Sequence, residues 1–129
     1  MTKPDKSRGE AKSPLPRTSF HILLALAEGA MHGYAIKQHA ETLTGGTVSP
    51  GPGTLYDAIA RLEEQGLVEE SAEPRDEPAH AQRRYYRLTR AGRRVLNAEV
   101  SRLSSIVDYA TSRGLGVRGG VRRDPRMST

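Results

Sequence analysis

The chain has 129 residues, of which 36% are hydrophobic, so its length fits one small domain with tails better than two domains. It contains no cysteine, which excludes a disulfide framework and thiolate catalysis, and no apolar run of the roughly 18 residues that a membrane-spanning helix needs. The N-terminus is charged and does not resemble a signal peptide, so we expect a cytoplasmic protein, associated with the nucleoid if it binds DNA.

Positive charge is concentrated at the two ends of the chain. Residues 1–18 carry five Lys/Arg against two acidic residues, and residues 113–129 carry five Arg against one. Since the formal net charge is +5, the remainder of the chain is left with −2. Basic tails favour binding to a polyanion such as nucleic acid, although solvated ends have the same composition. We expect a disordered basic arm at residues 1–17 and a disordered basic tail at residues 113–129.

A first helix is predicted to start near Phe20, with Thr18 or Ser19 as its cap, and to end near Glu28 and Gly29. Its dense apolar content predicts a helix buried in the core.

A second helix is expected to begin at His32–Gly33 and to end at Gly45–Gly46. Its expected inward positions are Tyr34, Ile36, Ala40 and Leu43. The polar positions left outside are Lys37, Gln38 and Glu41.

The third predicted helix has both ends marked in the sequence. Pro52 suits the first helical position, Gly51 the cap before it, and Gly66 the position after the last turn. An apolar stripe with spacings of three and four residues consists of Leu55, Ala58, Ile59 and Leu62. A helix this short is unstable alone in water, so the stripe must pack on other elements while the polar face stays exposed.

After the third helix, the spacing of the apolar residues changes to two, as in a β-strand. Residues 67–71 and 84–88 are predicted to be strands of a hairpin, with residues 72–82 as its flexible tip. Thr89 can cap a fourth helix, in which apolar residues recur with the spacing of a coiled-coil seam. The seam consists of Leu96, Val100, Leu103, Val107 and Ala110, and Ile106 widens it.

This order of elements predicts an α+β, mostly α, fold: a winged helix-turn-helix with a C-terminal dimerisation helix. The winged-helix domain is expected at residues 18–88 and the dimerisation helix at residues 89–112. In this fold the third helix enters the major groove of DNA and the hairpin, or wing, follows the backbone beside it.

Three segments resemble the PadR family of transcriptional regulators. They are His32–Ile36, Gly53–Val68 and Arg83–Gly92, and together they extend the resemblance from about Phe20 to Ala110. The resemblance implies a winged-helix dimer of the compact subgroup, which usually represses by binding pseudo-palindromic operators. It also implies that the two subunits pack together through residues of the fourth helix, namely Leu96, Val100, Leu103, Ile106, Val107 and Ala110. Some members release DNA when they bind phenolic acids or multidrug-like compounds. Multidrug-sensing members carry a tryptophan in the fourth helix; this chain has none, and Leu103 takes the matching position.

By position, the resemblance places DNA contacts on the second helix, the start of the third helix and the wing. The predicted DNA-binding residues are Tyr34, Lys37, Ser49, Gly53, Thr54, Tyr56, Arg61, Arg83 and Arg84. Alternatives remain open at several of them. Tyr34 and Tyr56 can instead complete the core, Arg61 can pair with nearby carboxylates, and either Arg83 or Arg84 can pair with Glu69 or Glu70 on the neighbouring strand.

Two other functions remain open from the sequence: a sensor whose small-molecule effector binds at the dimer interface and releases DNA, and a winged helix that binds only proteins. The four histidines lack the spacing of metal ligands, and no nucleophile or phosphate-loop motif occurs. We therefore expect no enzyme activity, no metal and no cofactor, with double-stranded DNA and a second copy of the chain as partners.

Overall fold

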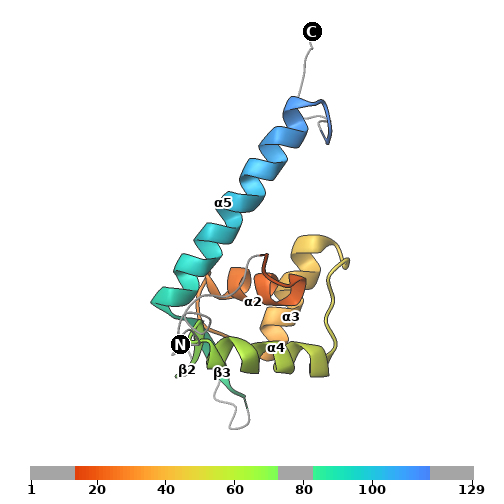
Figure 1. Ribbon diagram of the computed structural model, residues 1–129. Coiled ribbons are helices and arrows are strands. Elements are labelled where there is room, and N and C mark those ends of the chain that lie inside the picture. The colour runs from red at the N-terminus through yellow and green to blue at the C-terminus, as the bar shows by residue number, and fades with distance from the viewer. Residues whose placement is uncertain (1–13, 73–82, 117–129) are drawn as a thin grey trace. The chain divides into compact units, whose positions relative to one another are not determined.

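The computed structural model describes residues 14–72 and 83–116. Along the chain these residues form α2 (Arg17–Leu26), β1 (Met31–His32), α3 (Gly33–Thr44), α4 (Pro52–Glu64), β2 (Val68–Ser71), β3 (Tyr85–Leu88) and α5 (Arg90–Ser112) (Figure 1). The predicted α+β, mostly helical class is confirmed. The tip of the predicted hairpin at residues 73–82, the arm at residues 1–13 and the tail at residues 117–129 lie outside the described residues.

The chain divides into two compact units, one up to Asn97 and one from Ala98. The first unit contains every helix and strand from α2 to β3 and the first two turns of α5. The second contains the rest of α5. The division falls inside α5, nine residues after the predicted boundary between residues 88 and 89.

Helix α2 is the centre of the first unit, because it packs against both α3 and α4 and touches β3. The predicted start of this helix near Phe20 was wrong. The helix begins at Arg17 after Pro16, which offers no side-chain cap but accepts a bond from the Phe20 N–H through its carbonyl oxygen (2.9 Å). Leu15 is buried in the core cluster, so the ordered domain also begins before residue 18.

Helix α3 begins and ends where the sequence predicted. His32 is its N-cap, and Gly45 ends it in the left-handed conformation at φ 63°. Ile36 and Ala40 are buried as expected, but Tyr34 and Leu43 are 58% and 55% exposed, so their predicted core positions were wrong. The buried stripe of α3 is therefore narrow.

The predicted ends and buried face of α4 are confirmed. Gly51 is the N-cap, Pro52 the first residue, and the four stripe residues from Leu55 to Leu62 are all buried. Gly66 follows the helix at φ 77°, where its N–H donates to the Glu63 carbonyl and the Leu67 N–H to the Leu62 carbonyl. This pair of bonds is a Schellman motif, and it sends the chain directly into β2.

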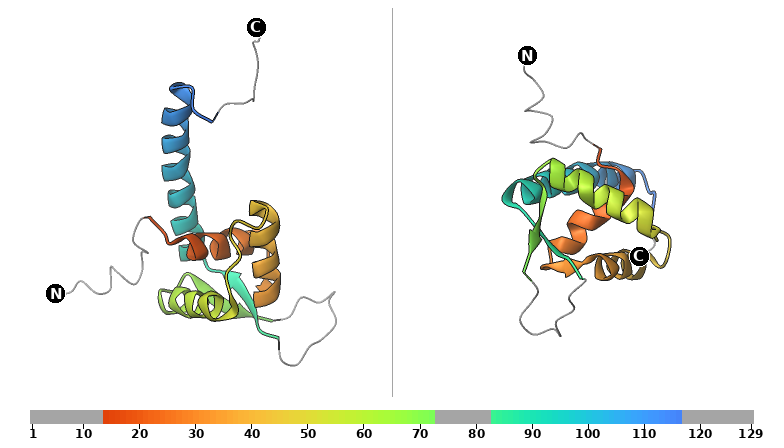
Figure 2. Two further views of the ribbon diagram at one scale, coloured as in Figure 1. Left: turned by 90° about the vertical axis from the view of Figure 1, so that its right-hand side faces the viewer. Right: turned by 90° about the horizontal axis from the view of Figure 1, so that it is seen from below.

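Strands β2 and β3 are antiparallel, with Val68 opposite Leu88 and Ser71 opposite Tyr85. Each begins one residue later than predicted. A third strand was not predicted: β1 pairs with the other edge of β3 and makes a three-stranded sheet in the order β1-β3-β2. Figure 2 shows β2 and β3 side by side next to α4.

Thr89 is the cap of α5, as predicted: its hydroxyl accepts a bond from the Gly92 N–H (3.0 Å) and donates to the Gly66 carbonyl (2.6 Å). Gly92 packs closely against the junction between α4 and β2, where a Cβ on Gly92 would be 2.1 Å from the Leu67 carbonyl oxygen. Leu96, predicted at a dimer interface, is instead buried in the core of its own chain. Across the described residues, no helix combines the length and the apolar character that crossing a membrane requires.

Candidate nucleic-acid interface

One open pocket of about 510 Å³ lies in the first unit, where the start of α3, the first turns of α4 and the start of β3 meet. We call it the basic-aromatic pocket; it is lined by His32, Gly33, Tyr34, Tyr56, Arg83, Arg84 and Tyr86. Four of the predicted DNA-binding residues therefore come together here, from three segments of the chain. Tyr34 and Tyr56 are both about half exposed, at 58% and 47%, so their rings are accessible from solvent.

Tyr56 reaches the pocket because Gly33 has no side chain. A Cβ at Gly33 would lie 2.1 Å from the Tyr56 hydroxyl oxygen and 2.6 Å from the carbon that bears it. The tyrosine ring of α4 thus lies directly against the backbone of the first turn of α3. This contact sets the position of the predicted groove-facing side chain relative to α3.

His32 connects α3 with the wing. Its Nδ1 accepts a hydrogen bond from the Ala35 N–H (3.2 Å), which caps α3, and its Nε2 lies 3.1 Å from Nη1 of Arg83. A guanidinium can only donate, and the role of the ring nitrogen beside it depends on the tautomer of His32. Arg83 thus adds a cationic group close to the first turn of α3, which suits an anionic oxygen.

The arginines of the wing differ in their partners: Arg83 lies beside His32, whereas Arg84 and Arg87 pair with carboxylates of β2. Arg84 donates to a carboxylate oxygen of Glu70 on β2 (3.0 Å), and further along β3 Arg87 donates to Glu69 (2.7 Å). Arg84 therefore fits the alternative in which a wing arginine pairs across the strands. Both ion pairs are exposed, so they stabilise the fold little.

Tyr86 lines the back of the pocket and is buried. Burial raises the pKa of its hydroxyl above the usual value, and the negative charge of Glu63 raises it further. The hydroxyl therefore stays protonated at neutral pH.

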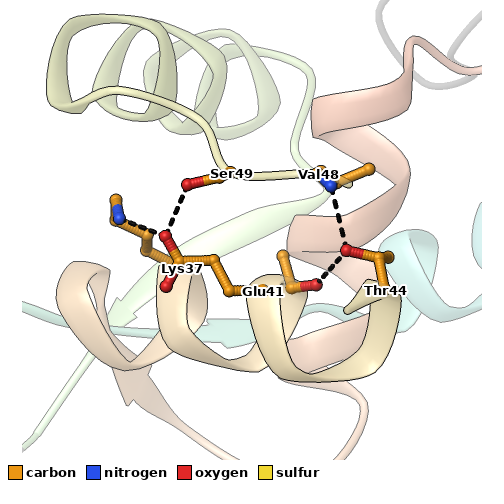
Figure 3. Close-up of polar contacts among 6 residues, drawn as sticks. Lys37, Glu41, Thr44, Val48 and Ser49 are labelled. Atoms are coloured by element: carbon orange, nitrogen blue, oxygen red, sulfur yellow. Dashed lines mark hydrogen bonds and ion pairs between the residues drawn. The ribbon is translucent and has the colours of Figure 1, made fainter. Parts of the chain in front are cut away.

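Lys37 and Ser49 lie apart from this pocket and share one partner, Glu41 (Figure 3). Lys37 is one helical turn before Glu41 on α3 and pairs with its Oε2. The Ser49 hydroxyl, from the connection between α3 and α4, donates to the same oxygen (2.5 Å). These bonds, from Lys37 first and from Ser49 second, lower the pKa of the Glu41 carboxyl.

Thr44 holds the backbone of this connection separately. Its hydroxyl donates to the Ala40 carbonyl (2.8 Å) and accepts a bond from the Val48 N–H (2.9 Å), as Figure 3 shows. The turn between the two helices is thereby fixed by a threonine that the sequence did not single out.

The remaining predicted DNA contacts lie along α4. Gly53 and Thr54 are exposed in its first turn, where the positive end of the helix dipole favours an anion. Arg61 is exposed in the last turn, at the opposite end of the same helix. It does not line the basic-aromatic pocket.

The sequence did not single out three residues that contact the predicted DNA-binding residues. His32 and Gly33 line the basic-aromatic pocket, and Glu41 binds Lys37 and Ser49. A Lys followed by Glu four residues later is a recognisable ion-pair spacing, so the Lys37–Glu41 pair could have been found. The contact of Gly33 with Tyr56 joins two helices and has no local signal. Within residues 14–72 and 83–116, no three metal-ligating side chains are grouped.

In the second unit, the predicted dimer residues beyond Leu96 lie on α5. Val100, Ile106 and Val107 are exposed, the last two by 52% and 55%, while Leu103 and Ala110 are partly covered. Two further large hydrophobic residues that the sequence analysis passed over, Tyr109 and Leu115, are also exposed. Apolar surface of this extent on α5 and the residues directly after it is unusual unless a partner covers it.

Comparison with known proteins agrees with this geometry. A curated protein, the uncharacterized 37.1 kDa protein in transposon Tn4556 of Streptomyces fradiae, is 40% identical over 85 residues; the match covers 66% of this chain and only 22% of that protein. Among solved structures, a transcriptional regulator from Clostridium thermocellum has a TM-score of 0.61 at 24% identity, covering 92% of this chain and 100% of that one. Bacillus subtilis PadR in complex with operator DNA has a TM-score of 0.57 at 21% identity, covering 67% and 48%.

At these identities the two solved structures establish the fold, which is that of the PadR and winged-helix regulators. The family itself follows from a direct match over residues 22–98, which extends from α2 into α5. Its members are transcriptional regulators and not enzymes. The chain belongs to the transcriptional regulator PadR-like family.

Proposed function

We propose that this chain is a homodimeric DNA-binding repressor that recognises a pseudo-palindromic operator. The observation that carries the proposal is the basic-aromatic pocket, which gathers Tyr34, Tyr56 and Arg83 from the two helices of the helix-turn-helix and from the wing. The B. subtilis PadR structure, which has the same fold, is a complex with operator DNA. Each subunit would place the first turns of α4 in a major groove, with the wing beside the backbone.

The contacts divide into two roles. Arg83, with the His32 ring beside it, is suited to a phosphate oxygen, and phosphate contacts supply affinity that depends on salt but not on sequence. Thr54 and Tyr56 project from the first turns of α4 and are suited to base edges, which supply discrimination. Arg84 contributes less than Arg83, because Glu70 already neutralises its charge.

The dimer is proposed from the exposed apolar face of α5. Val100, Leu103, Val107 and Ala110 repeat with the spacing of a coiled-coil seam, and Ile106 widens it. A symmetric pair of such helices would set the distance between two half-sites, which in helix-turn-helix dimers is about one turn of the double helix.

Selection of bound sequences from a random duplex pool tests DNA binding and half-site spacing together. The expected result is an enriched inverted repeat. Arg83→Ala should then lower affinity for operator and random duplexes alike and reduce the slope of log K against log salt by about 1, whereas Tyr56→Ala should cost about 1–3 kcal/mol mainly on the operator. Arg94→Ala, which removes the same charge from α5, is the control. Equal behaviour of all three variants would refute the proposed interface.

The dimer is tested by light scattering after size-exclusion chromatography. Val107→Asp places a charge in the seam and should give monomers with weak operator binding. Ser105→Asp adds the same charge about half a turn around α5, on its exposed polar side, and should leave the dimer intact. A wild-type monomer that binds no duplex at low salt would leave a protein-binding winged helix as the better explanation.

A further inference from the structure

Glu41 holds two groups that the sequence assigned to DNA. A single carboxylate oxygen, Oε2, accepts from the Lys37 ammonium and from the Ser49 hydroxyl (Figure 3). The side chains of Lys37 and Glu41 are each about 30% exposed, so this pair lies at the surface of the helix-turn-helix and not in the core. The Ser49 hydroxyl fixes the orientation of the carboxylate from the α3–α4 connection.

A carboxylate in this place competes with DNA. A phosphate oxygen is an anionic acceptor for the same donors, so Lys37 can reach a phosphate only by weakening its pair with Glu41. If the pair is broken, a negative charge remains beside the DNA backbone and repels it. If the pair is kept, Lys37 adds no net charge to the interface.

The backbone hydrogen bonds of the turn do not involve the Glu41 carboxylate. The Thr44 hydroxyl holds the Val48 N–H and the Ala40 carbonyl, both of which are backbone groups. A partly exposed i, i+4 ion pair on a helix surface, such as Lys37–Glu41, contributes little to the stability of the fold. Neutralising Glu41 therefore changes the charge at the surface while the helix-turn-helix keeps its shape.

We propose that Glu41 is a positioning residue that restrains Lys37 and thereby lowers the affinity of the protein for every duplex, whatever its sequence. The inference rests on the proposed DNA-binding function and adds a residue that opposes binding within the same surface. Glu41→Gln should therefore bind DNA more tightly than the wild type, and its binding should depend more steeply on salt.

The test is fluorescence anisotropy with the full chain, on its selected operator and on a random duplex, over a salt series. Release of one cation to a phosphate adds about 0.9 to the slope of log K against log salt. Between about 50 and 200 mM salt, the affinity advantage of Glu41→Gln should therefore shrink about 3.5-fold, on both duplexes. Thermal unfolding of the variant should match the wild type.

Two controls separate this effect from net charge. Glu28→Gln removes the same charge from a carboxylate that pairs with His39, and it should change the slope much less. In a Lys37→Met background, Glu41→Gln should no longer change the slope. The inference is overturned if Glu41→Gln behaves as Glu28→Gln does, or if its effect survives without Lys37. A wild type that binds neither duplex would instead overturn the proposed function, and this inference with it.

Discussion

Gly92→Ala tests whether close packing or helix propensity decides the stability of the junction between β2 and α5. Gly92 is the third residue of α5, and a Cβ there would be 2.1 Å from the Leu67 carbonyl oxygen and 2.9 Å from Leu88 Cδ1. Ordinary contacts begin at 3.4 Å, so the backbone must separate by about 1.3 Å. Leu67 is fully buried, and its carbonyl also accepts a bond from the Thr89 N–H (3.1 Å).

The expected loss of stability follows from three contributions. Overpacking costs about 1–3 kcal/mol, and displacement of the Thr89 cap costs about 1 kcal/mol. The higher helix propensity of alanine returns about 1 kcal/mol. The net loss is about 2 kcal/mol, which lowers the Tm of a domain of this size by roughly 8–16 °C.

The assay is thermal and urea unfolding followed by circular dichroism at one protein concentration, since a dimer would make the Tm depend on concentration. Gly53→Ala is the matched control. Gly53 also lies in the first turn of a helix, but nothing is within 4 Å of its Cβ position, so alanine there should stabilise by up to about 1 kcal/mol. If Gly92→Ala raised the Tm as Gly53→Ala does, the packing argument would be refuted.

Three further changes have defined outcomes. Gly33→Ala should push the exposed end of the Tyr56 side chain outward and weaken operator binding in anisotropy while the Tm falls by no more than a few degrees; unchanged affinity would separate Tyr56 from DNA binding. Thr89→Ala should lower the free energy of unfolding by about 1–2 kcal/mol in urea melts, and Thr89→Ser should restore most of it, because the capping hydroxyl returns. The pKa of His21 is lowered by burial, and then by His39 and Arg17, so its contribution to stability is complete above pH 6.5 and is lost as the pH falls through the lowered pKa. His21→Gln should therefore flatten the Tm between about pH 6.5 and 5, and an identical fall in the variant would assign the effect to other groups.

The sequence predicted best where local chemistry fixes the backbone. Pro52 and Gly66 mark the ends of α4, and its apolar stripe docks as expected, because each signal acts within a few residues. The cap of α5 at Thr89 was found in the same way.

Predictions failed where distant segments decide the structure. Strand β1 has only two residues and exists through its pairing with β3, more than fifty residues later. Leu96 has the spacing of the α5 seam, but the first two turns of that helix belong to the domain core, so its burial is decided by packing and not by period. Tyr34 is exposed because the buried face of α3 is limited to Gly33, Ile36 and Ala40.

The sequence predicted individual residues of the candidate site but not which of them lie together. The family resemblance assigned Tyr34 and Lys37, on the same helix, to the same kind of DNA contact. The structure separates them, because Tyr34 lines the basic-aromatic pocket while Lys37 pairs with Glu41. Such separation depends on which neighbours reach each side chain, and those neighbours come from α4, β3 and the α3–α4 connection.

The short strand β1 has a practical consequence for chimeras. His32 pairs with Tyr85 in the sheet and is also the N-cap of α3. The wing strand and the helix-turn-helix are therefore connected through this one residue. A wing transplanted from a relative would bring its own β3 edge but not the matching Met31–His32 partner, and so would tilt α3 as well. Operator preference in this scaffold should therefore be exchanged only by moving both segments together.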